Sequence, residues 1–190
     1  MIQKSVISAE NNWVEKNIRD FRGSPAQRIG DEWMLITAGN TQAGAGNWNT
    51  MTASWGGLGV LWHRDVAFMF VRPGRQTRAF VDANSIFTLS FFDRKYRKAL
   101  DLCGERSGRD HDKAMEASLT PIVFENNVAA GKASGAVSFK EASDIIVCRK
   151  IYTHDIDPVN FLDSAIADNY PIQDYHRMYV GEVLLLLTAK

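Results

Sequence analysis

The chain has 190 residues, of which 45% are hydrophobic and 23% are charged. This length and composition fit one globular domain with ample apolar material for a core. The 22 basic and 22 acidic residues balance, so net charge gives no reason to expect nucleic acid or an anionic membrane as a partner. We therefore expect no nucleic-acid partner and no membrane partner.

The two cysteines, Cys103 and Cys148, are far apart and belong to no CxxC or Cys/His pattern. This spacing argues against a disulfide framework or a zinc site. The N-terminal residues MIQKSVISAENNWVEK lack the apolar segment of a secretory signal. The longest apolar run, residues 183–187, is much shorter than a membrane span. We expect a cytoplasmic protein with two buried thiols and no metal site.

Apolar periodicity and turn residues divide the chain into short elements. Thr77 and Asp93 are the expected N-caps of two helices, and Gly104 is the expected end of the second. In chain order we predict a polar helix over 8–19, a strand over 32–39, a loop over 40–49, strands over 49–57 and 65–73, a helix over 76–85, a strand over 86–92, a helix over 93–104, a further helix starting near Asp110, and strands over 121–124, 136–139, 143–156 and 175–189.

Strands dominate this pattern, and the few helices do not alternate with them as in βαβ units. We therefore predict a mainly β protein, a closed or nearly closed barrel with short flanking helices. The last strand supports a barrel, because from Met178 to Leu187 it is apolar on both faces except at Glu182. Gly181 is expected to mark a β-bulge in this strand.

The stretch NTMTASWGG, residues 49–57, is unusually polar and small for a strand. Side chains alternate across a strand, so Thr50, Thr52 and Ser54 should form a row of hydroxyls on one face. Such a row can follow a polyol chain that ends in a phosphate, because each hydroxyl both donates and accepts. The alternative is a solvent-facing stripe on an ordinary amphipathic strand, since Thr is a good strand residue.

A second segment, VRPGRQTR, places Arg72, Arg75 and Arg78 around a Pro-Gly turn, directly ahead of the helix expected at residue 76. A phosphate needs charge-assisted donors, and a helix N-terminus beside guanidinium groups supplies them. The alternative is a solvated basic turn. Together with the hydroxyl row, this segment favours a phosphorylated ligand.

Four blocks of the sequence resemble a known family. NTMTASWGGLGVLW, FVRPGRQTRAFVDANSIFTLSFF, YRKALDLCGERSGRDHDK and YHRMYVGEVL are similar to flavin reductase-like proteins, which include flavoredoxin. The resemblance covers roughly residues 31–188. It implies an FMN-binding split β-barrel of Greek-key-like topology over 31–190, with residues 1–30 as an N-terminal extension packed on it. It also implies a homodimer with FMN at or near the subunit interface.

The resemblance also implies which residues contact FMN. The segment from Asn49 to Trp55 would contact the ring and the ribityl chain, the arginines and Thr77 would approach the phosphate, and Ser90 to Phe92 would form a pocket wall. Gly74 and Gln76 stand where relatives often carry a larger polar residue and an aromatic one. The expected cofactor-binding residues are Asn49, Thr50, Met51, Thr52, Ala53, Ser54, Trp55, Arg72, Arg75, Thr77, Ser90, Phe91, Phe92 and His176.

Two further groups have open roles. His176 and Arg177, at the start of the last strand, could reach the ring edge or could form a surface pair. In the block SGRDHDK, Arg109, Asp110 and Lys113 are candidates for ion pairs. This block would either order a loop over the flavin or connect the two subunits of the dimer.

No side-chain catalytic group is expected, because a bound flavin carries the redox chemistry. The sequence contains no GxSxG, HExxH or P-loop motif, and GAGNWN lacks the third glycine of a dinucleotide fingerprint. We expect an oxidoreductase that passes hydride from NADH or NADPH to flavin, with a redox partner protein or an oxygenase as its acceptor. The alternatives are a flavoredoxin-like electron carrier with tightly bound FMN, and a non-catalytic flavin- or heme-binding module.

Overall fold

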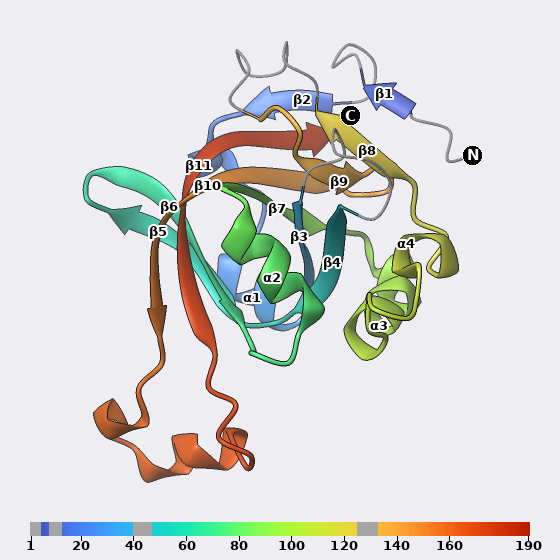
Figure 1. The fold of residues 1–190 in the computed structure, drawn as a ribbon. Helices are drawn as coiled ribbons and strands as arrows, with labels where there is room; N and C mark the ends of the chain where they lie inside the picture. Colours follow the sequence, from blue (N-terminus) through green and yellow to red (C-terminus); the bar gives the residue numbers. More distant parts are fainter. Residues whose placement is uncertain (1–4, 8–12, 40–46, 125–132) are drawn as a thin grey trace.

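The computed structural model describes residues 5–7, 13–39, 47–124 and 133–190. Short helices and two sheets form the fold, as Figure 1 shows. The strands are β1 (Ser5–Ile7), β2 (Trp13–Lys16), β3 (Met34–Gly39), β4 (Trp48–Ala53), β5 (Gly56–Leu61), β6 (Arg64–Val71), β7 (Ile86–Phe91), β8 (Pro121–Phe124), β9 (Val137–Phe139), β10 (Asp144–Asp155) and β11 (Arg177–Ala189). The helices are α1 (Pro25–Gly30), α2 (Gln76–Ala83), α3 (Arg97–Glu105) and α4 (Lys113–Glu116), with 3₁₀ turns η1 (Ile18–Asp20), η3 (Arg94–Tyr96), η5 (Pro158–Asn160) and η6 (Ser164–Asn169).

The large sheet has the strand order β4-β3-β7-β10-β11-β6-β5, and β2 pairs with the far end of β11. Every pairing in this sheet is antiparallel. The small sheet has the order β1-β8-β9, in which β1 runs parallel to β8. The prediction of a mainly β protein with a few short flanking helices is therefore confirmed.

The central strands are apolar on both faces because each face of the large sheet has its own core. In β10, Ile145 and Val147 belong to one cluster of buried residues, whereas Ile146 and Cys148 belong to the other. Alternating side chains point to opposite faces, so a strand covered on both sides needs no polar positions. The unbroken apolar runs in the second half of the sequence follow from this arrangement.

The predicted helix over 8–19 is wrong where the structure describes it. Residues 13–16 form β2, which pairs with β11 from Lys16 opposite Leu186 to Trp13 opposite Ala189, and Trp13 is buried. Pairing with a long apolar strand and burial of the indole outweigh a weak local helix preference. Residues 8–12, and residues 40–46 of the predicted loop, lie outside the described part. The boundary predicted at residue 30 stays a prediction.

The ends of the α3 and α4 helices differ slightly from the sequence prediction. Asp93 precedes η3 but its side chain makes no capping bond, and α3 continues past Gly104 to Glu105. The following helix begins at Lys113, later than the predicted Asp110, because the carboxylate of Asp112 caps it by accepting from the backbone N–H of Met115 at 3.1 Å. Helix ends shift by a residue or two wherever a neighbouring cap competes.

Gly181 occupies a crowded point of the large sheet. It pairs with Lys150, and the adjacent irregularity lies in β10 at Ile151 rather than at the glycine. A Cβ at position 181 would lie 2.7 Å from Cε1 of Phe87 and 2.8 Å from Cβ of Cys148. The glycine is needed for this close packing, so the bulge predicted at Gly181 is wrong in its position.

Candidate functional site

The start of β4 lies beside the first turn of α2. Before the helix, the backbone N–H of Arg75 donates to the carbonyl oxygen of Arg72 at 3.1 Å. This turn leaves Arg75 extended as the N-cap, so the prediction of Thr77 as the N-cap is wrong. Thr77 is instead buried in the first turn, where its Oγ1 accepts from Nδ2 of Asn49 at 3.2 Å. This bond ties β4 to α2.

The predicted row of hydroxyls on β4 is covered by its own chain. Oγ1 of Thr50 lies 2.9 Å from Oγ1 of Thr37, and Oγ1 of Thr52 donates to the carbonyl oxygen of Leu100 in α3 at 2.5 Å. Ser54 follows the end of the strand and is half-buried. The solvent-facing alternative is therefore wrong, because Thr50 is buried and Thr52 lies under α3.

The two arginines of the predicted phosphate site both contact neighbouring elements. Arg75 donates through Nη1 to the carbonyl oxygen of Gly104, at the end of α3. Arg72 donates to Oδ1 of Asp174 at 2.6 Å and to the carbonyl oxygen of Asn169 at 2.9 Å. Arg75 thus contacts the end of α3, whereas Arg72 contacts the segment that leads into β11.

His176 is buried next to these arginines, so the prediction of a surface pair is wrong for this residue. Its Nδ1 lies 3.0 Å from the hydroxyl of Tyr170, and its ring centroid lies 4.8 Å from that of Trp55. Burial, and then the positive charge of Arg72 and Arg75, lowers the pKa of His176 to about 4. The imidazole is therefore neutral at neutral pH.

This pKa predicts acid-sensitive stability. The unfolded imidazole titrates at 6.5 and the folded one at about 4, so the unfolded state binds the proton first and stability falls as the pH drops between these values. We expect a loss of at most about 3 kcal/mol from this group. Urea unfolding at several pH values gives the free energy of unfolding of each protein. His176→Gln should make this free energy fall less steeply as the pH drops. His63→Gln, in an exposed turn, should leave the slope unchanged. Parallel profiles for all three proteins would contradict the assignment.

Lys113 is a site residue whose role the sequence left open. Its buried Nζ donates to the carbonyl oxygens of Thr50 and, at 3.3 Å, of Cys103. Burial, opposed by Cys103 and reinforced by Arg75, lowers the pKa of Lys113 to about 8. Nothing in the local sequence distinguishes this lysine from an exposed one, because its burial arises where α4 folds back onto β4.

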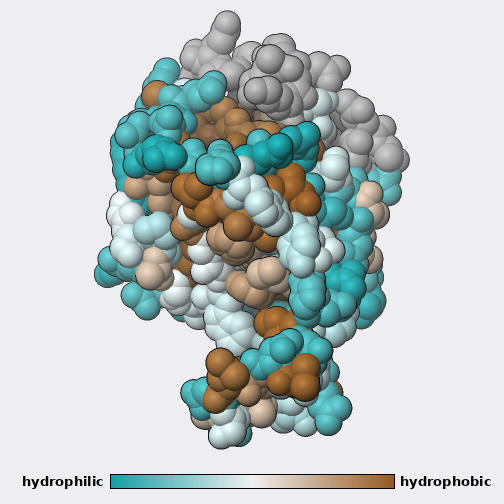
Figure 2. Space-filling model, turned by 90° about the vertical axis from the view of Figure 1, so that its left-hand side faces the viewer, coloured by the Kyte–Doolittle hydropathy of each residue, from teal (hydrophilic) through white to brown (hydrophobic). Residues whose placement is uncertain are grey.

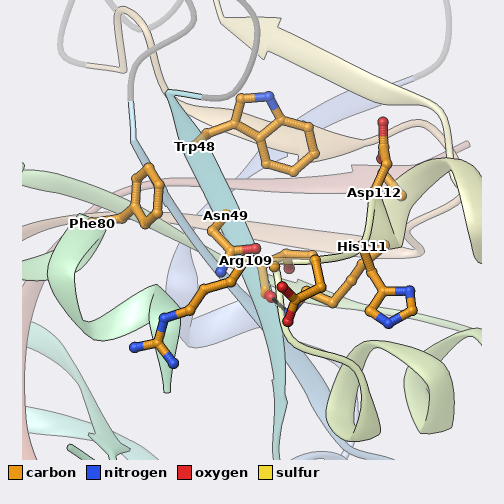
Figure 3. Close-up of a pocket in the computed structure, with 11 residues that line it drawn as sticks. Trp48, Asn49, Phe80, Arg109, His111 and Asp112 are labelled. Atoms are coloured by element: carbon orange, nitrogen blue, oxygen red, sulfur yellow. Dashed lines mark hydrogen bonds between the residues drawn. The ribbon is translucent and has the colours of Figure 1, made fainter. Parts of the chain in front are cut away.

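A cavity of about 350 Å³ opens at the start of β4. Figure 3 shows Trp48, Phe80 and Arg109 arranged around Asn49. The cavity combines aromatic surface, one amide, two basic side chains and the two acidic side chains of Asp110 and Asp112. It is lined by Trp48, Asn49, Thr50, Phe80, Arg109 and Lys113, among others.

Other predicted site residues lie in the hydrophobic core and not at this cavity. The hydroxyl of Ser90 is bonded to that of Ser138 at 2.8 Å, and the ring of Phe91 packs 5.0 Å from that of Phe21. Since β7 is a central strand between β3 and β10, its side chains are enclosed on both faces. The core residues of the predicted set are Met51, Ala53, Ser90, Phe91 and Phe92.

The charges around Arg75 suit an anion. Arg75 lowers the pKa of the Lys113 amine, so two positive charges lie close enough to repel one another. A phosphate would relieve that repulsion, and the first N–H groups of the eight-residue α2 favour a negative group as well. Asn49 offers an amide for hydroxyl groups, and Trp55 offers a partly exposed aromatic face. The residues present therefore fit FMN.

The described residues contain neither a metal-binding cluster nor a helix that could cross a membrane. Within residues 5–7, 13–39, 47–124 and 133–190, no cluster of three or more His, Cys, Asp or Glu side chains could hold a metal ion. In the same residues, no helix has the length and hydrophobicity needed to cross a membrane.

No protein-family model matches the chain, and no curated protein matches it by sequence. Three solved structures illustrate what the fold is similar to.

The flavoredoxin of Desulfovibrio vulgaris is 20% identical with a TM-score of 0.59, and the match covers 82% of this chain and 68% of that one. The FMN-binding domain of a flavin reductase-like enzyme from Shewanella baltica is 14% identical with a TM-score of 0.62, covering 94% and 78%. The NADH:FAD oxidoreductase SgcE6 of Streptomyces globisporus is 15% identical with a TM-score of 0.59, covering 84% and 78%. The chain therefore has the split-barrel fold of flavoredoxins and flavin reductase-like proteins, as the sequence predicted.

Proposed function

We propose that the chain is an FMN-binding flavoprotein that passes hydride from NADH or NADPH to flavin. The observation that carries this proposal is the pair of basic side chains Arg75 and Lys113, near the first turn of α2 and the cavity at Asn49. The fold is shared with an NADH:FAD oxidoreductase and with an FMN-binding domain, which supports the same conclusion.

Each site residue has a distinct part in this proposal. Arg75 and the first N–H groups of α2 would hold the phosphate, and Asn49 would bond the ribityl hydroxyls. Trp55 would shield one part of the ring from water. Bound FMN would supply the two-electron chemistry.

Two buried titratable groups, His176 and Lys113, would determine how much positive charge the site carries. His176 is neutral at neutral pH, and its bond to the Tyr170 hydroxyl fixes the orientation of its ring. The folded Lys113 amine has a pKa of about 8, and a phosphate nearby would raise that value by favouring the ammonium form.

The partners proposed here follow from the resemblance. We propose that the chain forms a homodimer and delivers its electrons to a redox partner protein or an oxygenase. A flavoredoxin-like electron carrier is the second candidate, because a flavoredoxin of 20% identity shares the fold.

An absorbance spectrum tests the proposed reaction. The protein is purified, loaded with FMN, freed of excess flavin and mixed under argon with NADH or with NADPH. We expect the visible flavin band to bleach with at least one nicotinamide, because reduction removes that absorbance. A flavin band that persists with both would favour the electron carrier. A heme Soret band, or a protein that retains no flavin, would contradict the proposal.

A further inference from the structure

A buried amine without a carboxylate partner lines the cavity at the start of β4. The side chain belongs to Lys113, which is 5% exposed. Within the part of the chain that the structure describes, Lys113 forms no ion pair, and its amine bonds to two backbone carbonyl oxygens, those of Thr50 and Cys103. A lysine this deeply buried is almost always paired with a carboxylate. Its position therefore indicates a role beyond packing.

Two carbonyl groups suit a neutral amine better than an ammonium ion. An ammonium ion has three N–H donors, and the third would have no acceptor among the described residues. A neutral amine donates one N–H to each carbonyl oxygen and keeps its lone pair free. Burial is the main reason why the pKa of Lys113 falls to about 8. At neutral pH about one amine in ten is then unprotonated, against fewer than about one in a thousand for an exposed lysine.

The lone pair of an unprotonated lysine is a nucleophile that forms Schiff bases with carbonyl compounds. Lys113 is part of the wall of the cavity of about 350 Å³, so a small molecule held there meets this amine. That volume lies at the lower end of the range of small-molecule sites. The cavity therefore suits a carbonyl compound built on a single ring.

The aromatic side chains of the same cavity favour a flat ligand. Figure 3 shows the rings of Trp48 and Phe80 near Asn49, at the cavity that Lys113 also lines. The ring of Trp48 is held by edge packing against Phe139, with the centroids 6.0 Å apart. Aromatic rings attract another ring by offset stacking or by edge contacts. A small aromatic aldehyde combines the ring and the carbonyl group that this cavity selects.

The most exposed aliphatic side chains of the chain lie away from this cavity. Residues 156–176, between β10 and β11, are called the arm below and extend beyond the sheet at the lower end of Figure 1. Leu162 and Ile172 are exposed there, and Figure 2 shows hydrophobic residues gathered at this lower end. No arm residue lines the cavity, and the arm contains no lysine. Adsorption of an apolar aldehyde on the arm therefore gives no lysine adduct there.

We propose that Lys113 captures small aromatic aldehydes as a Schiff base in this cavity. The lone pair of Nζ attacks the carbonyl carbon, the π electrons of the C=O bond move to oxygen, and the proton that nitrogen loses is the one that oxygen gains. The product of this step is a carbinolamine.

Loss of water completes the Schiff base. The carbinolamine hydroxyl takes up a proton and leaves as water, the nitrogen lone pair forms the C=N bond, and the iminium ion then returns the proton. One amine and one aldehyde give one imine and one water, and nothing is oxidised or reduced. His111 lines the same cavity, and its Nδ1 lies 2.9 Å from a carboxylate oxygen of Glu116. This imidazole can supply and take back the proton.

Reductive trapping tests this inference. The full chain, without added flavin, is mixed at neutral pH with benzaldehyde and sodium cyanoborohydride, which reduces the imine to a stable benzylamine, and mass spectrometry of peptides locates the benzyl groups. We expect Lys113 to be labelled at least about tenfold faster than the exposed Lys98, because more of its amine is unprotonated. Labelling of Lys113 that is no faster than that of Lys98 would overturn the inference.

The pH dependence of labelling identifies the amine that reacts. The rate at Lys113 should level off above about pH 8, whereas the rate at Lys98 should keep rising to about pH 10. Lys113→Met, which removes the amine and keeps an unbranched side chain, should abolish the fast phase. Circular dichroism checks that this variant is folded. A Lys113 profile that rises in parallel with that of Lys98 would contradict the reactive amine.

Two phenylalanine variants test the preference for aromatic aldehydes. Phe80→Leu should slow labelling of Lys113 by benzaldehyde several-fold, because a ring contact is lost, and should leave labelling by acetaldehyde unchanged. Phe161→Leu, in the arm, is the matched control and should slow neither. If Phe80→Leu slows both aldehydes equally, or neither, the aromatic preference is wrong.

This capture goes beyond the proposed flavin chemistry and needs no bound flavin, so the two can fail separately. With saturating FMN we expect slower labelling of Lys113, because FMN would fill the cavity and its phosphate would favour the ammonium form. Fast labelling that FMN does not slow would support the reactive amine and count against the proposed flavin site. A Lys113 that is never labelled would overturn the reactive amine and leave the flavin site standing.

Discussion

Replacing Asp144 with alanine is expected to lower the free energy of unfolding by about 3 kcal/mol, because the largely buried Arg28 loses its closer carboxylate and keeps only that of Glu32 at 3.3 Å. Asp144 is buried at the start of β10. Its carboxylate accepts from Nη2 of Arg28 at 2.9 Å and from Oγ1 of Thr188 at 2.8 Å. It therefore joins α1, β10 and the end of β11, and urea unfolding measures the loss.

The matched control is an ion pair on the surface. Asp101 and Arg97 lie one turn apart on α3 at 3.7 Å, and both side chains are about two-fifths exposed. Asp101→Ala should cost about 0.3–0.5 kcal/mol, the usual contribution of an exposed helical pair. Equal losses for the two variants would show that the Asp144 pair is solvated, contrary to its burial in the structure.

Replacing Arg75 with alanine is expected to weaken FMN binding about tenfold to a hundredfold. A charge-assisted contact to a phosphate contributes about 1.5–3 kcal/mol. Arg75 also donates to the carbonyl oxygen of Gly104, so the unfolding curve of the variant is recorded alongside the flavin titration. Fluorescence quenching of FMN gives the dissociation constant of each protein.

The control for Arg75 is Arg64, an arginine that lies away from the proposed phosphate site. Arg64 on β6 pairs with Glu182 at 3.5 Å and is about half exposed. Arg64→Ala should bind FMN as the wild type does. An Arg75→Ala protein that remains folded and binds FMN with unchanged affinity would place the phosphate elsewhere.

The sequence predicted most strands because their patterns depend on local alternation and on burial. β3, β6 and β10 stand out as apolar runs bounded by turn residues, and such runs look the same in any strand that two cores enclose. β2 was missed because its strand conformation depends on β11, whose paired residues lie 170 to 176 positions away in the sequence. Contacts of that range leave no local periodicity.

The candidate site was predicted in part. Asn49 and Thr77 do meet, because β4 and α2 are neighbours in the fold. Ser90 was grouped with them by resemblance, yet it lies in a central strand and bonds to Ser138. Alternation places a side chain on one face of a strand or the other, but it does not reveal which face meets a cavity.

The burial of Lys113 could not be predicted from the sequence. A lysine among charged neighbours is typical of an exposed loop, and its burial depends on the contact of α4 with β4 and α3. The arm shows the converse, because its acidic composition is visible in the sequence, whereas its projection from the body is not.

We propose that this chain holds FMN by its phosphate beside Arg75. The most direct test of this proposal is a titration of the wild-type protein with FMN and with riboflavin, which is the same molecule without the phosphate. We predict that FMN binds at least about tenfold more tightly than riboflavin, since the phosphate contact contributes about 1.5 kcal/mol or more. Equal affinity for the two flavins, or binding of neither, would show that no phosphate site exists beside Arg75.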